Sequence, residues 1–205
     1  PAAVAIAVMP TEIVRVLFER GAFVASDSAS TAAVLALFAI GLPAFVMIKV
    51  FSPAYFARED TKTPMQYATI SLIANTLGSI ALFFVFRNIG WAPELGIAIA
   101  TSFGGWLNAW LLWSTLSKRG EFEIDRRFKR NIPLILLSSA AMAGALYAGL
   151  FVLEPYLARK HGFLVQSGAL GLLVVIGLLT FGLMILITGA LSPAQLQRFR
   201  RRAGQ

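Results

Sequence analysis

Residues 30–64 read STAAVLALFAIGLPAFVMIKVFSPAYFAREDTKTP, and this stretch decides the fold of the chain. About 25 of its residues are apolar or small, and at about 1.5 Å of helix per residue such a run crosses a bilayer. One cation, Lys49, interrupts the run, and a polar turn at residues 57–64 ends it. The stretch therefore predicts a membrane-spanning helix with a charge in its interior and a charged junction at its end.

The composition of the whole chain agrees with a membrane protein. Hydrophobic residues make up 58% of the 205 residues and charged residues 14%, and the mean hydropathy is +0.74. Soluble domains are usually only about 45–50% apolar. The net charge of +8 comes from cations grouped between apolar runs, so it indicates topology and contact with anionic lipid headgroups, not nucleic-acid binding.

An all-α, polytopic bundle of transmembrane helices is expected. Residues 1–19 predict the tail of a truncated helix, kinked or restarted at Pro10, so we expect the chain to be the carboxy-terminal piece of a longer protein. Pro64 suits a first helical turn, with Thr61 or Thr63 as the cap. Small residues in the fourth segment predict close approach of a neighbouring helix. Five complete spans are expected, within residues 30–64 and at residues 64–86, 95–116, 132–153 and 163–191.

The distribution of cations predicts the orientation in the membrane. If the carboxyl terminus is cytoplasmic, the cytoplasmic segments carry twelve of the 18 Lys and Arg residues, the opposite side carries five, and Lys49 is the remaining one. This asymmetry follows the positive-inside rule. Residues 58–64, 118–131 and 192–205 are therefore expected in the cytoplasm.

The sequence disfavours an enzyme. The single histidine, His161, lies beside two cations in a short loop, and the acidic residues all lie near the ends of spans. No HExxH or GxSxG pattern occurs, and the chain has no cysteine. Transport or a passive structural role remains.

Four polar groups inside the spans are candidates for function. Lys49 either reaches the interface with its stem, forms a buried ion pair, or faces a cavity where it attracts an anionic headgroup. Asn75 and Asn108 suit interhelical hydrogen bonds, and Thr101 suits a bond to the carbonyl one turn back. If Asn75 and Thr101 face each other, their oxygens and the Ile97 carbonyl could coordinate a small hard cation.

The run YFAREDTKTP at residues 55–64, with LFERGAF at 17–23 and GLP at 41–43, resembles the MurJ (MviN) lipid II flippases. These belong to the multidrug/oligosaccharidyl-lipid/polysaccharide exporter superfamily. The resemblance covers essentially the whole chain. It implies the carboxy-terminal part of a fourteen-helix, two-lobe transporter, from the end of the ninth helix onward.

The resemblance also implies four regions along the chain. These are the end of the second six-helix lobe at 1–117, a basic cytoplasmic connection at 118–131, two further helices forming a groove for the lipid tail at 132–191, and a basic cytoplasmic tail at 192–205.

The function implied by the resemblance is translocation of lipid II, the undecaprenyl-pyrophosphate-linked peptidoglycan precursor. It would move from the inner to the outer leaflet of the bacterial inner membrane by alternating access, without ATP hydrolysis. Lys49 and Arg20 become the candidates for substrate binding. The candidates for a gate or junction are Arg58, Asp60, Lys62 and Pro64.

Some members of the family bind a sodium ion. Carried over, the site would use Asn75, the Ile97 carbonyl and Thr101, while Ser79 stands where an aspartate would be wanted. Further partners would come from a helix in the missing amino-terminal part of the same chain, and a proton-coupled relative could dispense with the site. A drug or polysaccharide exporter of the same superfamily and a non-transporting membrane scaffold remain as alternatives.

Overall fold

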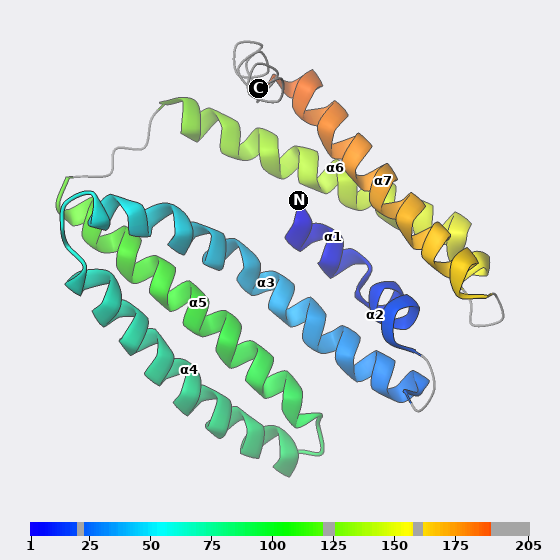
Figure 1. Ribbon diagram of the computed structural model, residues 1–205, viewed down its shortest axis with the longest axis horizontal. Helices are drawn as coiled ribbons and strands as arrows, with labels where there is room; N and C mark the ends of the chain where they lie inside the picture. The colour runs from blue at the N-terminus through cyan, green and yellow to red at the C-terminus, as the bar shows by residue number, and fades with distance from the viewer. Residues whose placement is uncertain (20–22, 121–125, 158–161, 190–205) are drawn as a thin grey trace. The chain divides into compact units, whose positions relative to one another are not determined.

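The computed structural model describes residues 1–19, 23–120, 126–157 and 162–189, with the backbone alone at 126–129. Within these residues the structure has seven helices and no strand (Figure 1). They form two compact units, one of residues 10–123 and one of residues 1–9 with 124–205. Each unit is described by itself.

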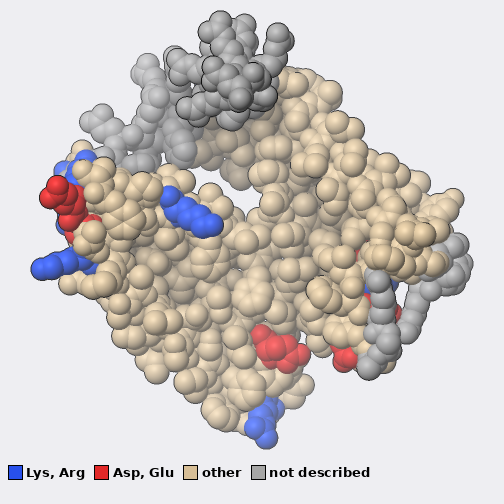
Figure 2. Space-filling model, in the orientation of Figure 1, with Lys and Arg blue, Asp and Glu red and all other residues tan. Residues whose placement is uncertain are grey.

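Five of the helices are long and apolar enough to cross a membrane, which confirms the predicted all-α bundle. On the face drawn in Figure 2, the described charged side chains form a few small groups on a mostly uncharged surface. The spanning helices are α3 (Ala25–Phe56), α4 (Lys62–Asn88), α5 (Pro93–Lys118), α6 (Arg126–Leu157) and α7 (Phe163–Thr188).

In the unit of residues 10–123, α5 lies between α3 and α4 and packs along both (Figure 1). The helices α3 and α4 contact each other only slightly, and the short α2 (Pro10–Phe18) packs on α3. Accordingly, 44% of the apolar stretch of α5 is buried, against 6% of that of α4. Because α5 lies in the middle, both α3 and α4 pack mainly against it.

Small residues explain why α5 occupies the middle. A Cβ atom added to Gly96 would lie 2.8 Å from the backbone carbonyl carbon of Leu82 in α4. A Cβ added to Gly41 of α3 would lie 2.8 Å from Ser102 Oγ of α5, and that hydroxyl donates to the Leu37 carbonyl at 2.8 Å. The predicted close approach of helices at these small residues is confirmed.

The unit of residues 1–9 and 124–205 contains α6, α7 and the short α1 (Ala2–Val8), which packs on α6. Leu146 of α6 and Leu173 of α7 are fully buried, and each lies over a glycine of the other helix, Gly177 and Gly149 respectively. These contacts hold the pair together. The predicted groove for a lipid tail stays a prediction.

Some helix ends differ from the prediction. The helix α4 begins at Lys62, two residues before the expected Pro64, and neither threonine supplies its cap. The carboxylate of Asp60 does so, because its Oδ1 accepts the backbone N–H of Thr63 at 3.0 Å. A charged acceptor at the positive end of a helix is favoured over a hydroxyl.

The helix α6 also begins early, at Arg126, inside the segment predicted as a connection. Basic residues are good helix formers, so the helix extends past its apolar span.

Candidate functional site

The turn between α3 and α4 closes α3 with a Schellman motif. The backbone N–H of Asp60 donates to the Tyr55 carbonyl at 3.1 Å, and that of Glu59 donates to the Phe56 carbonyl at 3.0 Å. Glu59 has a φ of 58°, and in the described residues it is the one non-glycine residue with a positive φ. A glycine is usual at this position because the left-handed conformation crowds a Cβ atom.

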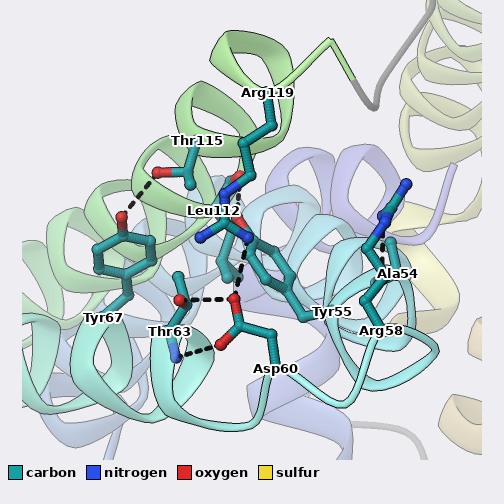
Figure 3. Close-up of polar contacts among 9 residues, drawn as sticks. All are labelled: Ala54, Tyr55, Arg58, Asp60, Thr63, Tyr67, Leu112, Thr115 and Arg119. Atoms are coloured by element: carbon teal, nitrogen blue, oxygen red, sulfur yellow. Dashed lines mark hydrogen bonds and ion pairs between the residues drawn. The ribbon is translucent and has the colours of Figure 1, made fainter.

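Asp60 is the centre of the polar contacts at this turn (Figure 3). Besides the cap to the Thr63 backbone, its Oδ2 accepts the Thr63 hydroxyl at 2.8 Å and Arg119 Nη1 at 2.9 Å. Arg119 follows the last residue of α5, so this ion pair ties the start of α4 to the end of α5.

The same contacts set the charge state of Asp60. The backbone N–H of Thr63, then the Arg119 guanidinium and the Thr63 hydroxyl, stabilise the carboxylate and lower the pKa of Asp60 from 3.8 to about 2. Asp60 is therefore charged at every physiological pH.

Tyr55 joins α3 to α5 through a buried hydrogen bond. Its side chain is 1% exposed, and its hydroxyl donates to the Leu112 carbonyl at 2.7 Å (Figure 3). The ring packs with Phe51, Leu112 and Leu116, and the Arg119 guanidinium lies 5.8 Å from the ring centroid. One arginine thus contacts both the end of α3 and the start of α4.

A third fastening joins α4 to α5. The hydroxyls of Tyr67 and Thr115 are 2.7 Å apart, one turn further into α4 (Figure 3). We call Tyr55, Asp60, Thr63, Tyr67 and Arg119 the junction cluster.

The four residues predicted as a gate or junction lie at this turn but differ in their contacts. Asp60 is the centre of the cluster, whereas Arg58 is exposed and donates to the Ala54 carbonyl of α3 at 3.1 Å. Lys62 is exposed and makes no ion pair with the described residues. Pro64 lines a pocket described below.

Four residues with contacts at this turn were not predicted as site residues from the sequence: Tyr55, Tyr67, Thr115 and Arg119. The sequence carried only a weak signal for these contacts. Two tyrosines flank the turn, and an arginine directly follows the last residue of α5. Only the packing of α5 between its neighbours brings these residues together.

The residues of the predicted cation site also come together, between α4 and α5. Asn75 Oδ1 accepts the Ser79 hydroxyl at 3.2 Å and lies 3.3 Å from Thr101 Oγ1, which also donates to the Ile97 carbonyl at 2.9 Å. The described residues thus offer four neutral oxygens in one place and no carboxylate. Hard divalent cations take about six or more oxygens, so this cluster supplies part of a coordination shell.

Of the two predicted substrate-binding cations, the structure describes Lys49, which does not contact the junction cluster. Lys49 is exposed on α3 and makes no hydrogen bond or ion pair with the part of the chain described. Arg20 lies outside the described residues.

A pocket of about 340 Å³ opens between α3, α4 and α5 below the turn. Apolar side chains form most of its wall, and its polar members are Ser52, Thr61 and Asn108. The full lining comprises Ile48, Ser52, Phe56, Thr61, Pro64, Met65, Ala68, Asn108 and Leu112.

Five helices of the described residues are long and apolar enough to cross a membrane, which defines a multi-pass α-helical membrane protein. A family model described as "Lipid II flippase MurJ" matches residues 1–188. The chain belongs to this family.

Curated relatives agree. A probable lipid II flippase MurJ of Rhizobium tropici is 39% identical over 98% of this chain, and one of Rhizobium meliloti (strain 1021) is 45% identical over 72%. A third, from Rickettsia prowazekii (strain Madrid E), is 32% identical over 88%. The matches cover 37%, 26% and 34% of these relatives, so the chain spans about a third of their length.

Proposed function

We propose that this chain is the part of a lipid II flippase that supplies one side of its transport pathway. The observation that carries the proposal is the family match over residues 1–188, together with relatives named as lipid II flippases. The protein would move lipid II from the inner to the outer leaflet of the bacterial inner membrane by alternating access, as transport and not as catalysis.

The junction cluster supports a mechanical role for α3, α4 and α5. Three separate contacts fasten these helices at one end: Tyr55 to Leu112, Asp60 to Arg119 and Tyr67 to Thr115. Alternating access is largely a rigid-body movement of one helical bundle against another. The cluster keeps the three helices together during that movement, so Asp60 braces the gate and does not bind the substrate.

Lys49 is the proposed contact for the substrate's pyrophosphate. A cation inside a span is costly unless it faces a partner, water or an anionic ligand. The described residues give Lys49 no partner, and its exposed side chain is free to meet a ligand. Arg20 is proposed for the same pathway from its sequence position alone.

The cluster of Asn75, Thr101 and the Ile97 carbonyl is proposed as part of a sodium site. Its oxygens are grouped as a small hard cation requires, and residues beyond this chain would complete the shell. We also propose that the carboxyl terminus lies in the cytoplasm and that the basic segments contact anionic lipids.

Complementation tests the proposed activity. The intact protein, expressed in a bacterium depleted of its own flippase, is expected to restore growth and the appearance of lipid II in the outer leaflet. Growth without lipid II export would contradict the proposal. Drug resistance or polysaccharide export in its place would identify another exporter of the superfamily, and no transport at all would indicate a scaffold.

A further inference from the structure

The helix α3 contains an interior proline, Pro43, that interrupts its backbone hydrogen bonds. Proline has no N–H, so the Ala39 carbonyl lacks the donor that a regular helix would give it, and the proline ring crowds that carbonyl. Membrane helices tolerate such a break where side chains of a neighbouring helix supply hydrogen bonds to the backbone near it. Pro43 is therefore a point at which α3 can bend.

Two side chains of α5 donate hydrogen bonds to carbonyls of α3 just before this proline. Ser102 Oγ donates to the Leu37 carbonyl at 2.8 Å, and Trp106 Nε1 donates to the Ile40 carbonyl at 3.0 Å. The two donors lie one turn apart on α5, and the two acceptors lie on either side of Ala39. We call these two hydrogen bonds the clamp, because they hold the backbone before the break against α5.

The two parts of α3 on either side of the break pack differently. After Pro43, the buried residues include the large Phe51 and Tyr55, and Tyr55 also bonds to α5. Before it, the buried residues of α3 are all small, namely Ser28, Ala32, Ala39 and Gly41. Small side chains do not interlock with a neighbouring helix as large ones do, so the part before the break can tilt with little repacking.

The hydrogen bonds show the same asymmetry. Within the described part of the chain, no side-chain hydrogen bond joins residues 25–36 of α3 to α5, and Ser28 donates instead to Glu19 at 2.8 Å. The other interior proline of α3, Pro53, lies only two residues before Tyr55, inside the part that is joined to α5. The clamp is thus the polar attachment to α5 of the whole part before the break.

We propose that Pro43 is a hinge in α3 and that Ser102 and Trp106 hold it in the conformation of this structure. When the clamp opens, residues 25–42 tilt about Pro43 while the end at the turn stays joined to α5. Thr31 lies 12 residues before Pro43, or about 18 Å along the helix, so a tilt of about 20° moves it by about 6 Å. A place for this movement in transport rests on the proposed flippase function, whereas the hinge itself does not.

Distances between pairs of spin labels test the hinge in the intact protein in membrane vesicles. This chain has no cysteine, so two introduced cysteines carry the labels where any others in the protein are replaced. One exposed pair, Thr31→Cys with Glu94→Cys, reports on the amino-terminal parts of α3 and α5. A second exposed pair, Ala57→Cys with Lys118→Cys, reports on their ends at the turn.

The clamp is removed by Ser102→Ala and Trp106→Phe together, which delete the two donors and change little else in size. We expect the first label pair to gain a population shifted by about 6 Å and the second pair to keep its wild-type distance. The matched control is Trp110→Phe, one turn further along α5, because Trp110 is 56% exposed and makes no hydrogen bond with the described residues. It is expected to change neither distance.

A proline replacement identifies the pivot. Pro43→Ala restores the missing N–H, so adding it to the double variant is expected to return the first pair to its wild-type distance. The hinge is overturned if this distance is not restored, if both pairs shift because the helices separate as a whole, or if neither pair shifts. Should the double variant not fold, Trp106→Phe alone is expected to give a smaller shifted population, since its half-exposed indole loses only the N–H. None of these distances depends on transport, so the hinge and the flippase activity fail separately.

Discussion

Asp60 holds its position through bonds that require its negative charge. At the residue scale this predicts a pH-dependent effect of Asp60→Asn, which loses the ion pair to Arg119. The pKa of Asp60 is depressed to about 2, so its contribution to stability is fully present above the ordinary value of 3.8 and is lost as pH falls through about 2. We expect a lower Tm for the variant at pH 7, and a difference from the wild type that shrinks between pH 4 and pH 2.

Thermal unfolding of the purified protein at several pH values measures this difference. Glu59→Gln is the matched control, because it removes a charge from the same turn but no hydrogen bond or ion pair found among the described residues. A difference that stays constant down to pH 2 would contradict the role of the Asp60 charge.

Glu59 carries strain that a glycine would remove. Its φ of 58° crowds the Cβ atom, at a cost of about 1 kcal/mol. We expect Glu59→Gly to raise the free energy of unfolding by about that amount. Gly90 has a φ of 76° with open space around it, so Gly90→Ala is expected to lower stability by a similar amount. Changes of the same sign in both variants would argue against backbone strain.

At the element scale, the contact between α4 and α5 depends on Gly96. A Cβ atom there would lie 2.8 Å from the Leu82 carbonyl carbon and 2.9 Å from its oxygen, and backbone atoms cannot move aside alone. We expect Gly96→Ala to cost about 1–3 kcal/mol of stability by overpacking. The control is Gly144→Ala, where nothing lies within 4 Å and helix propensity predicts a gain of up to about 1 kcal/mol. Equal effects on Tm would show that the helices separate freely at this point.

The sequence was sufficient for the elements and insufficient for the contacts between them. Apolar runs and prolines predicted five spans, because hydropathy and helix-starting residues are properties of each segment alone. The small residues of α5 predicted close packing, but not that α5 lies between α3 and α4. Arg119 was assigned only to a basic connection, since nothing near it in sequence reveals Asp60, 59 residues away. Long-range polar partners need the three-dimensional arrangement.

At the scale of the whole molecule, the proposed contact between Lys49 and the substrate can be tested by mutation. Its exposed side chain makes no hydrogen bond or ion pair with the described residues, so replacing it by alanine removes a charge without breaking a contact within them. If the charge binds a pyrophosphate, its removal weakens substrate binding. A loss of about 1.4 kcal/mol of binding free energy corresponds to about a tenfold loss of affinity, so we expect export to fall about tenfold or more.

The comparison is made in the intact protein, with lipid II export as the measurement. We expect Lys49→Ala to lose export while its Tm stays close to that of the wild type, and Lys49→Arg to retain most of it because the charge is kept. Arg87→Ala, which removes an exposed cation at the end of α4, is the control and is expected to export normally. Normal export by Lys49→Ala would place this lysine outside the pathway and leave its charge as an interfacial one. A loss in the alanine variant that arginine rescues is the pattern expected of a charge that faces the substrate.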